Sequence, residues 1–251
     1  HVDKSIDNPF IFAKTNVMGT LNLLHASLIS WRENYKEKLF YHISSDEVFG
    51  SLEENENSFS EDSRYNPNSP YSASKASSDH FVRAYGRTYG FPYIISNSSN
   101  NYGPYQYPEK IIPLFISNII NQKELPIYGD GTNVRDWIHV NDHVKAIDLI
   151  FHHGKNNSTY LVGGENEVRN IDLACTLIKY TDKLMGREKG FSNRLIKFVK
   201  NRKGHDFRYS VDISKLKNEL AWAPEIKFDI GIKETINWYI KNTKKQFKQK
   251  N

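Results

Sequence analysis

The chain has 251 residues, of which 38% are hydrophobic and 13% aromatic, enough to bury a core in one large domain or two small ones. No apolar run approaches the roughly 18 residues that a transmembrane helix needs, which excludes a membrane span. The formal net charge is +5, but a C-terminal tail carries the excess on Lys241, Lys244, Lys245, Lys248 and Lys250. The rest of the chain has equal numbers of basic and acidic side chains, so we expect no nucleic-acid partner.

Strands and helices alternate through the first hundred residues. Apolar residues at helical spacing predict a helix over 8–28, and a short apolar run predicts a strand over 39–44. A long helix follows from Pro70 to about Tyr89, and then a strand over 92–96. This strand–helix–strand order predicts an α/β fold, a partial Rossmann-like, doubly wound parallel sheet with right-handed crossovers.

Beyond Gly103 the predicted elements are shorter and mixed, which indicates a smaller α/β lobe. The patterns predict helices over 109–121, 141–153, from about 170 and over 229–245, and strands over 125–128, 137–140, 159–162, 196–199 and 207–211. Ile232, Ile236 and Ile240 share one face of the last helix. We expect one domain over 1–103 and a second lobe over 104–251, with part of 137–165 returning to the first sheet.

Tyr71 and Lys75 stand four residues apart on the predicted helix that begins at Pro70, so they share a face. Using a phenol as a base near neutral pH requires its pKa to fall by about three units, or about 4 kcal/mol. An ammonium about 4 Å away supplies about 4 kcal/mol at an effective dielectric constant of 20. The pair is therefore a sufficient base, although the same spacing also suits an exposed Tyr and Lys.

Ser45, Asp46 and Glu47 follow the strand over 39–44, and ligands bind at the carboxyl ends of strands in open α/β sheets. Adjacent carboxylates on a regular strand face opposite ways, so both serve one site only if the backbone turns, as Gly50 suggests. Two carboxylates in one site favour one acid and one base. The alternative is a solvated pair of loop carboxylates.

Several stretches resemble bacterial dTDP-glucose 4,6-dehydratases of the extended short-chain dehydrogenase/reductase superfamily: HVDKSI, HISSDEVFG, SPYSASKASSDH, SNSSNNYGPYQYPEKIIP, PIYGDGTNVRDWIHV and RKGHDFRYSVD. The resemblance runs in order from His1 to about Tyr239. The YxxxK pair is common to the superfamily, whereas the Asp-Glu pair and the SNNYGP segment are more specific to dehydratases.

The resemblance implies that NAD is the resident cofactor and that the 1–103 region belongs to an NAD-binding domain. Tyr71 takes the proton of the sugar 4-hydroxyl while hydride leaves carbon 4, Ser45 holds that hydroxyl, and Lys75 assists Tyr71 and binds the ribose. Glu47 then removes the proton on carbon 5 as Asp46 protonates the departing 6-hydroxyl. Hydride returns to carbon 6 and carbon 5 is reprotonated. The expected product is a 4-keto-6-deoxy sugar for deoxysugar biosynthesis.

The resemblance also implies binding residues. Asn101 and Thr15 are expected beside the cofactor. The nucleotide sugar is expected to contact Ser45, Asn100, Lys110, Ile111, Pro126, Ile127, Tyr128, Arg135, Asn170, Asn201, Arg202, Lys203, Gly204 and His205. The guanidinium fork of Arg135 suits a diphosphate.

The sequence departs from the family pattern in three places. The family usually has Thr where Ser45 stands, and Asp and Pro where Asn201 and Lys203 stand. No glycine-rich phosphate loop follows a predicted strand, and we expect that loop before His1.

Further expectations concern metal, location and assembly. His139 and His143 have no third ligand at suitable spacing, so we expect no metal. The lone Cys175 fits a reducing, cytoplasmic setting. By resemblance, the helices starting near Asn8 and Pro70 form a homodimer interface. Two alternatives remain open: an inactive fragment that binds nucleotide sugar, and a related epimerase or decarboxylase.

Overall fold

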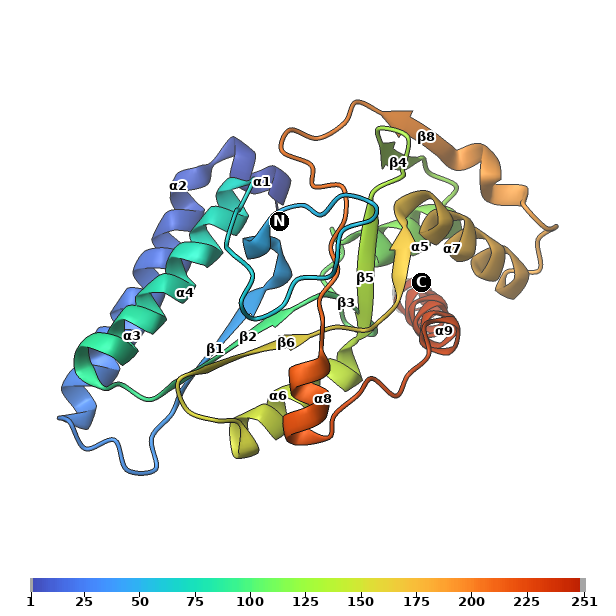
Figure 1. Cartoon of the computed structure of the whole chain (residues 1–251). Coiled ribbons are helices and arrows are strands. Elements are labelled where there is room, and N and C mark those ends of the chain that lie inside the picture. The colour runs from blue at the N-terminus through green and yellow to red at the C-terminus, as the bar shows by residue number, and fades with distance from the viewer. Residues whose placement is uncertain (1, 249–251) are drawn as a thin grey trace. The chain divides into compact units, whose positions relative to one another are not determined.

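A computed structural model describes residues 2–248 of the chain, which divide into two compact units (Figure 1). Unit 1 takes the residues up to Ser99, then His143–Gly163 and Lys203–Ala223. Unit 2 takes Asn100–Asp142, Gly164–Arg202 and the chain from Pro224 onwards. Lys250, one of the five tail lysines, lies outside the described residues.

Unit 1 is built on a parallel sheet in the order β1-β2-β6. These strands are Phe40–Ser45, Tyr93–Ser98 and Ser158–Val162. Every residue of the central strand β2 is buried, as expected for a strand covered on both faces. Ser45 at the end of β1 is in register with Ser98 at the end of β2. The residues that follow these strands therefore leave the same edge of the sheet.

The helices of unit 1 are α1 (Val2–Asp7), α2 (Pro9–Phe12), the π-helical η1 (Ala13–Met18), α3 (Gly19–Trp31), α4 (Pro70–Tyr89) and α8 (Ser214–Leu220), with a 3₁₀ turn η2 at Asp46–Phe49. Helix α4 begins at Pro70 because Ser69 and Ser72 form a reciprocal capping box there. It ends at Gly90, which adopts a left-handed conformation with φ +63°. These signals explain why both ends of α4 were predicted correctly.

An aromatic cluster holds α3 and α4 at the amino end of the sheet. The rings of Trp31 and Phe91 stack with centroids 4.7 Å apart, and Leu24 and Val82 are fully buried beside them. This packing fixes the C-terminal half of α4 against β2 through Tyr93 and its neighbours. Its N-terminal half, with Tyr71 and Lys75, lies near the strand ends.

Unit 2 contains two small sheets. Strand β3 (Asn100–Tyr102) runs parallel to β5 (Val134–His139), which pairs antiparallel with β7 (Glu167–Arg169). Strand β4 (Leu125–Tyr128) runs parallel to β8 (Ile196–Val199). The remaining helical elements are α5 (Ile111–Ile120), α7 (Asn170–Leu184), η3 (Phe191–Leu195) and α9 (Phe228–Lys248), and α6 (Val140–His153) crosses the boundary between the units.

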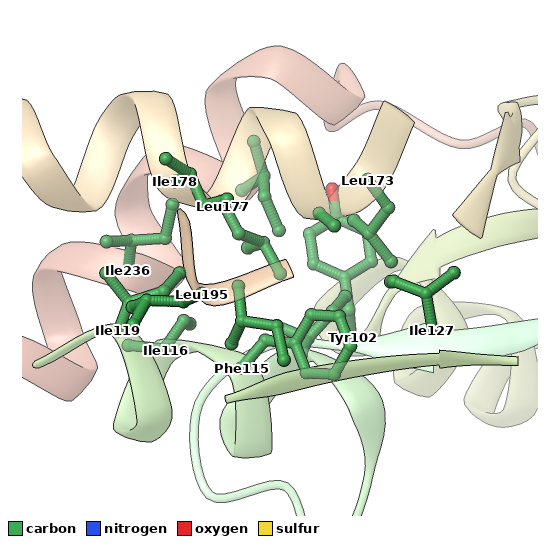
Figure 2. Close-up of a cluster of buried hydrophobic side chains, with 14 of the residues drawn as sticks. Tyr102, Phe115, Ile116, Ile119, Ile127, Leu173, Leu177, Ile178, Leu195 and Ile236 are labelled. Atoms are coloured by element: carbon green, nitrogen blue, oxygen red, sulfur yellow. The ribbon is translucent and has the colours of Figure 1, made fainter. Parts of the chain in front are cut away.

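The core of unit 2 lies between α5, α7 and α9 (Figure 2). Ile116 and Leu177 are fully buried there, with Phe115 at 1% exposure. Ile232, Ile236 and Ile240 are buried in the same cluster, so the apolar face predicted for the last helix is confirmed. The three helices enclose a continuous apolar interior, which accounts for unit 2 as a separate compact body.

The predicted alternation of strands and helices, with a parallel sheet and a smaller mixed lobe, is confirmed. The strand predicted over 207–211 is wrong, because that segment makes only the isolated bridges Leu52–Arg208 and Phe59–Val211. These bridges, and the packing of α8 on β6, also place Lys203–Ala223 in unit 1, whereas we expected it in the second lobe. Among the described residues no helix is both long and apolar enough to cross a bilayer.

Candidate active site

The residues Ser45, Asp46 and Glu47 form a turn at the carboxyl end of β1. Ser45 keeps an extended conformation, and its hydroxyl accepts a hydrogen bond from the Glu47 backbone N–H at 3.3 Å and donates one to Asp46 Oδ1 at 3.2 Å. The chain then closes a 3₁₀ turn that ends at Gly50, with φ +88°. The backbone therefore leaves the strand conformation at Asp46, as two carboxylates in one site would need. In a regular strand, the side chains of Asp46 and Glu47 would point to opposite faces of the sheet.

Tyr71 and Lys75 lie on the first turns of α4, in the same unit. The Tyr71 backbone N–H donates to the hydroxyl of Ser5 at 3.1 Å, and its ring packs edge-on against Phe12 with centroids 6.2 Å apart. The Lys75 ammonium donates to the carbonyl oxygen of Ile43 in β1 at 2.8 Å. Helix α4 is thus joined to α1, α2 and the end of β1 by groups beside the two predicted catalytic side chains.

The pKa of Tyr71 shows that its hydroxyl and the turn share one environment. Burial raises this pKa well above its usual value, and the charges of Glu47 and Asp46 raise it further, whereas a hydrogen bond with Ser45 lowers it. The structure therefore brings together four of the five predicted catalytic residues around the phenol. In the chain by itself the pKa moves upward, opposite to the lowering we expected from Lys75, because burial and nearby carboxylates dominate.

Lys75 is also perturbed. Burial lowers the pKa of its ammonium, and the charge of Asp79, one helical turn further along α4, raises it in part. Strongly perturbed pKa values, such as the raised one of Tyr71 and the lowered one of Lys75, are common among the ionisable groups of active sites. This combination distinguishes Tyr71 and Lys75 from an exposed helical pair.

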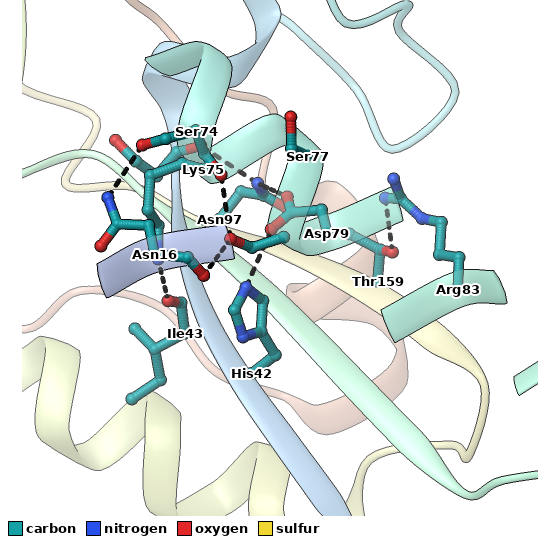
Figure 3. A network of polar contacts seen from close by, with 12 residues as sticks. Asn16, His42, Ile43, Ser74, Lys75, Ser77, Asp79, Arg83, Asn97 and Thr159 are labelled. Atoms are coloured by element: carbon teal, nitrogen blue, oxygen red, sulfur yellow. Dashed lines mark hydrogen bonds and ion pairs between the residues drawn. The ribbon is translucent and has the colours of Figure 1, made fainter. Parts of the chain in front are cut away.

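Sequence reasoning missed a buried carboxylate at this site. Asp79 continues the series of Tyr71 and Lys75 at four-residue spacing and is fully buried, with His42 Nε2 3.0 Å from its Oδ1 (Figure 3). Burial acts to raise the pKa of Asp79, but the hydrogen bond and charge of His42, with a further hydrogen bond from Tyr65, hold it below its usual value. A scan of α4 for polar residues at spacing four from Lys75 would have found it.

Thr15 lies in the π-helical segment η1 and is exposed. Its neighbour Asn16 is held against α4, because Asn16 Nδ2 donates to Ser74 Oγ at 2.9 Å and Ser78 Oγ donates to the Asn16 carbonyl at 2.7 Å. Single π-turns inside α-helices occur frequently at functional sites. The sequence periodicity predicted one regular helix here and gave no signal for the π-segment.

Most of the expected nucleotide-sugar contacts lie in unit 2. Tyr128 ends β4, and the turn after it leads to Gly131, whose carbonyl accepts from the Ile171 backbone N–H at 3.0 Å at the start of α7. A side-chain carbon on Gly129 would stand 3.4 Å from Asn201. Arg135, which is 7% exposed, pairs across β5 and β7 with Val168. The end of β4, the start of α7 with Asn170 and the segment after β8 are therefore contiguous.

The other expected contacts in unit 2 lie on β3, at the start of α5, on β4 and after β8. Asn100 and Asn101 lie on β3, Lys110 precedes α5 and Ile111 begins it. Pro126 is exposed, but Ile127 is 2% exposed and belongs to the hydrophobic core. A ligand on this strand would therefore contact the backbone of Ile127 and not its side chain. Arg202 follows Asn201 and donates its backbone N–H to that side chain at 2.9 Å.

The remaining expected contacts, Lys203, Gly204 and His205, belong to unit 1. Gly204 has φ +58°, and a side-chain carbon there would stand 2.5 Å from the Asn68 carbonyl oxygen. Asp206, directly after the turn, accepts a hydrogen bond from Asn68 Nδ2 at 2.6 Å. This turn is therefore packed against the residues that precede the cap of α4.

The histidine pair considered as a metal ligand is buried, with His139 at 4% and His143 at 8% exposure. Burial lowers the pKa of both, to about 4 for His143. Within residues 2–248, no group of three or more His, Cys, Asp or Glu side chains is arranged to hold a metal ion.

Comparison with known proteins identifies the family. A family model described as GDP-mannose 4,6 dehydratase matches residues 1–235. A dTDP-glucose 4,6-dehydratase from Escherichia coli is 48% identical over 255 residues, which cover 97% of this chain and 70% of that protein. The chain belongs to the dTDP-glucose 4,6-dehydratase family. Another member of the family, from Neisseria meningitidis, is 46% identical over 249 residues, covering 96% of this chain and 70% of its own length.

Solved structures agree with membership of the dTDP-glucose 4,6-dehydratase family. The crystal structure of DesIV, a dTDP-glucose 4,6-dehydratase from Streptomyces venezuelae with NAD and TYD bound, matches with a TM-score of 0.88 and 41% identity, over 97% of this chain and 71% of that one. A UDP-glucose 4-epimerase from Thermotoga maritima matches with a TM-score of 0.82 but only 27% identity, over 96% of this chain and 74% of that one. Identity therefore favours the dehydratases over the epimerases.

Proposed function

We propose that this chain carries the catalytic groups of an NAD-dependent lyase that converts dTDP-glucose to dTDP-4-keto-6-deoxyglucose. The observation that carries the proposal is the turn of Ser45, Asp46 and Glu47, which the Ser45 hydroxyl closes and whose carboxylates act on the pKa of the buried Tyr71 phenol. The Tyr–Lys pair alone suits any oxidation of a sugar hydroxyl, whereas two carboxyl groups beside it suit an elimination that needs one acid and one base. Family membership supports the same reaction.

The residues present fit the nicotinamide–ribose end of NAD. Lys75 places an ammonium at the carboxyl end of β1, where one of its hydrogens is bonded to the Ile43 carbonyl and the others suit ribose hydroxyls. Asn101 and Thr15 are the further residues that we assign to the cofactor. When bound, NAD supplies the hydride acceptor and donor that the overall reaction requires.

Tyr71 is the base for the first step. It removes the proton of the sugar 4-hydroxyl, and Ser45, which already hydrogen-bonds the Tyr71 side chain, holds that hydroxyl in place. Lys75, one helical turn further along α4, is the positive charge that we assign to stabilise the phenolate that the step requires. The high pKa of Tyr71 in the chain alone means that a second positive charge near the phenol would assist the same proton transfer.

Glu47 and Asp46 divide the elimination between them. Glu47 removes the proton on carbon 5, which the 4-ketone has made acidic, and Asp46 donates a proton to the departing 6-hydroxyl. Asp46 is 2% exposed and Glu47 is partly exposed, so the two carboxyl groups have different surroundings. Different surroundings are the usual means by which one carboxyl group acts as an acid and its neighbour as a base.

The contiguous segments of unit 2 are assigned to the nucleotide. Arg135 presents a guanidinium that suits the diphosphate, and Tyr128, Asn170 and Asn201 lie along the same group of segments. The other unit 2 contacts, and the Lys203–His205 turn of unit 1, complete the substrate residues that we assign.

We also assign a homodimer interface to α2, η1, α3 and α4. Large apolar side chains are exposed along these helices, with Phe10 at 83%, Leu23 at 63% and Ile29 at 61%. Large apolar side chains exposed along neighbouring helices are typical of a protein interface. A second copy of the chain is the partner that we propose for this surface. Sedimentation should show a dimer, which the double substitution Phe10→Lys and Leu23→Lys should convert to a monomer.

We further assign the protein to the cytoplasm, in keeping with the free thiol of Cys175.

The assignment of the base is tested with Glu47→Gln. This variant should slow the loss of water from dTDP-glucose by about 10²–10⁴-fold, because it removes a general base and keeps the shape of the side chain. Glu54→Gln, on the exposed loop that follows, is the matched control and should retain full activity. Mass spectrometry of the sugar product follows the loss of water directly. Unchanged dehydration by Glu47→Gln would show that another group is the base.

Binding is tested separately by thermal unfolding with NAD and with dTDP-glucose. Each ligand should raise the melting temperature of the chain in a concentration-dependent way, since ligands stabilise the state that binds them. A folded chain that responds to the nucleotide sugar but not to NAD, and forms no product, would favour a binding fragment over an enzyme.

A further inference from the structure

Three donors converge on Asp79, the buried carboxylate of α4, and Figure 3 labels two of them, His42 and Asn97. Tyr65 donates its hydroxyl to Oδ2 at 2.8 Å, Asn97 donates Nδ2 to the same oxygen at 3.1 Å, and His42 Nε2 lies 3.0 Å from Oδ1. These donors come from β1, β2 and the loop before α4. Asp79 therefore ties the helix that carries Tyr71 to two strands and a loop.

Asn97 does more than stabilise this carboxylate. It is fully buried in β2, and the same Nδ2 atom that donates to Asp79 donates to the carbonyl oxygen of Ser45 at 3.0 Å. An amide nitrogen has two hydrogens, so both bonds form together. One side chain thus joins the helix of the Tyr–Lys pair to the first residue of the Ser45–Glu47 turn.

This link is separate from the pairing of the strands. Strands β1 and β2 are already in parallel register from Phe40–Tyr93 to Ser45–Ser98 through their backbones. The two hydrogen bonds of Asn97 hold the end of β1 at a fixed distance from α4. Hydrogen bonds between the strand backbones cannot fix this distance, because α4 is not part of the sheet.

We infer that Asn97 and Asp79 are positioning residues, which hold the turn bearing the acid and the base at its working distance from the helix bearing Tyr71 and Lys75. This inference rests on the proposed dehydration for its kinetic consequence, but its structural part does not. Neither side chain is required to touch the sugar, since both are fully buried. Loss of the bridge should therefore affect the rate of the elimination more than the binding of the nucleotide sugar.

The test compares two variants that each remove a donor from Asp79. Asn97→Ala breaks the bridge. The control Tyr65→Phe removes the hydroxyl that donates to the same carboxylate and that accepts from Arg83 at 2.9 Å and from Asn97 at 3.5 Å, but it keeps both bonds from Asn97 to Ser45 and Asp79. Asn97→Ser is a milder version, because one hydroxyl hydrogen serves only one of the two acceptors. Circular dichroism and melting temperature establish that each variant is folded before either readout is taken.

The first readout is hydrogen exchange of the full chain without ligand. Asn97→Ala or Asn97→Ser should increase exchange in a peptide covering residues 46–50, whose turn depends on the bonds made by Ser45, and Tyr65→Phe should not. The second readout is steady-state dehydration of dTDP-glucose. Asn97→Ala should lower kcat by about 10²-fold with little change in KM, as a misplaced catalytic group does, and Tyr65→Phe should have a much smaller effect.

The two readouts separate the two proposals. Unchanged exchange over residues 46–50 in both Asn97 variants overturns the positioning role, whatever the activity. Equal losses of kcat in Asn97→Ala and Tyr65→Phe overturn it as well, because they would show a general effect of the network on stability. If the unmodified chain with NAD produces no dehydrated sugar while exchange responds as expected, the bridge stands and the proposed function fails.

Discussion

Asp79→Asn is the substitution whose effect on stability follows most directly from the structure. The carboxylate has four lone-pair sites and receives donors from Tyr65, Asn97 and His42. An asparagine keeps the shape but has a single acceptor oxygen, so its amide group must face at least one of these donors. The variant therefore replaces an attraction by two hydrogen-bond donors pointed at each other in a buried site.

The expected cost is about 3–5 kcal/mol at neutral pH, the range observed when one partner of a buried charged pair is removed. For a chain of this size that corresponds to a fall in melting temperature of roughly 6–20 °C, which differential scanning calorimetry resolves easily. The pH dependence has a defined sign. Because the folded state lowers the pKa of Asp79 below 3.8, its charge stabilises the protein above that pH, and the difference between wild type and variant should narrow as pH falls below it.

The chain contains a matched surface pair for comparison. His152 Nε2 lies 3.6 Å from Asp148 Oδ1, with side-chain exposures of 58% and 76%. Asp148→Asn should leave the melting temperature nearly unchanged, because solvent-exposed ion pairs contribute little. If Asp79→Asn were as mild as Asp148→Asn, or if its effect grew as pH fell below 3.8, the reasoning about a buried carboxylate held by three donors would be refuted.

Two further predictions concern the core of unit 2 and the turn after β1. Leu177→Ala, in the fully buried cluster of unit 2, should lower the free energy of unfolding by about 3–5 kcal/mol in denaturant titrations, whereas Leu184→Ala on the same helix, 46% exposed, should have a small effect. Gly50→Ala should be more destabilising than Gly186→Ala. Both glycines have positive φ, but only at Gly50 would the new carbon stand 2.3 Å from a backbone oxygen, that of Asn66. Equal stability of the two glycine variants would show that this turn relaxes freely.

The elements predicted most accurately were those with local signals at their ends. Helix α4 begins at Pro70 with a serine cap before it and ends before a glycine, and these signals act within a few residues. Strands β4 and β8 also occur where the apolar runs predicted them. In contrast, β3 and β7 have three residues each and exist only through pairing with β5, which no local pattern reveals.

The residues of the candidate site also fall into two groups, those that local sequence signals predicted and those that depend on the fold. Tyr71, Lys75 and the Asp46–Glu47 pair were predicted because their spacing and their place after a strand are visible in the sequence. Asp79 and Asn97 were missed because their importance depends on which donors the fold brings to a buried carboxylate. The transfer of Lys203–Ala223 to unit 1 was missed for a similar reason, since it depends on bridges between residues about 150 positions apart, such as Leu52 and Arg208.

The direction of the Tyr71 pKa shift links the charges of the site to its chemistry. Burial raises the pKa of the Tyr71 phenol most, and the charges of Glu47, Asp46 and Asp79 raise it further. The same carboxylates that distinguish an elimination site from a simple oxidation site therefore work against the first proton transfer. Under the proposed mechanism, a positive charge bound beside Tyr71 would offset them.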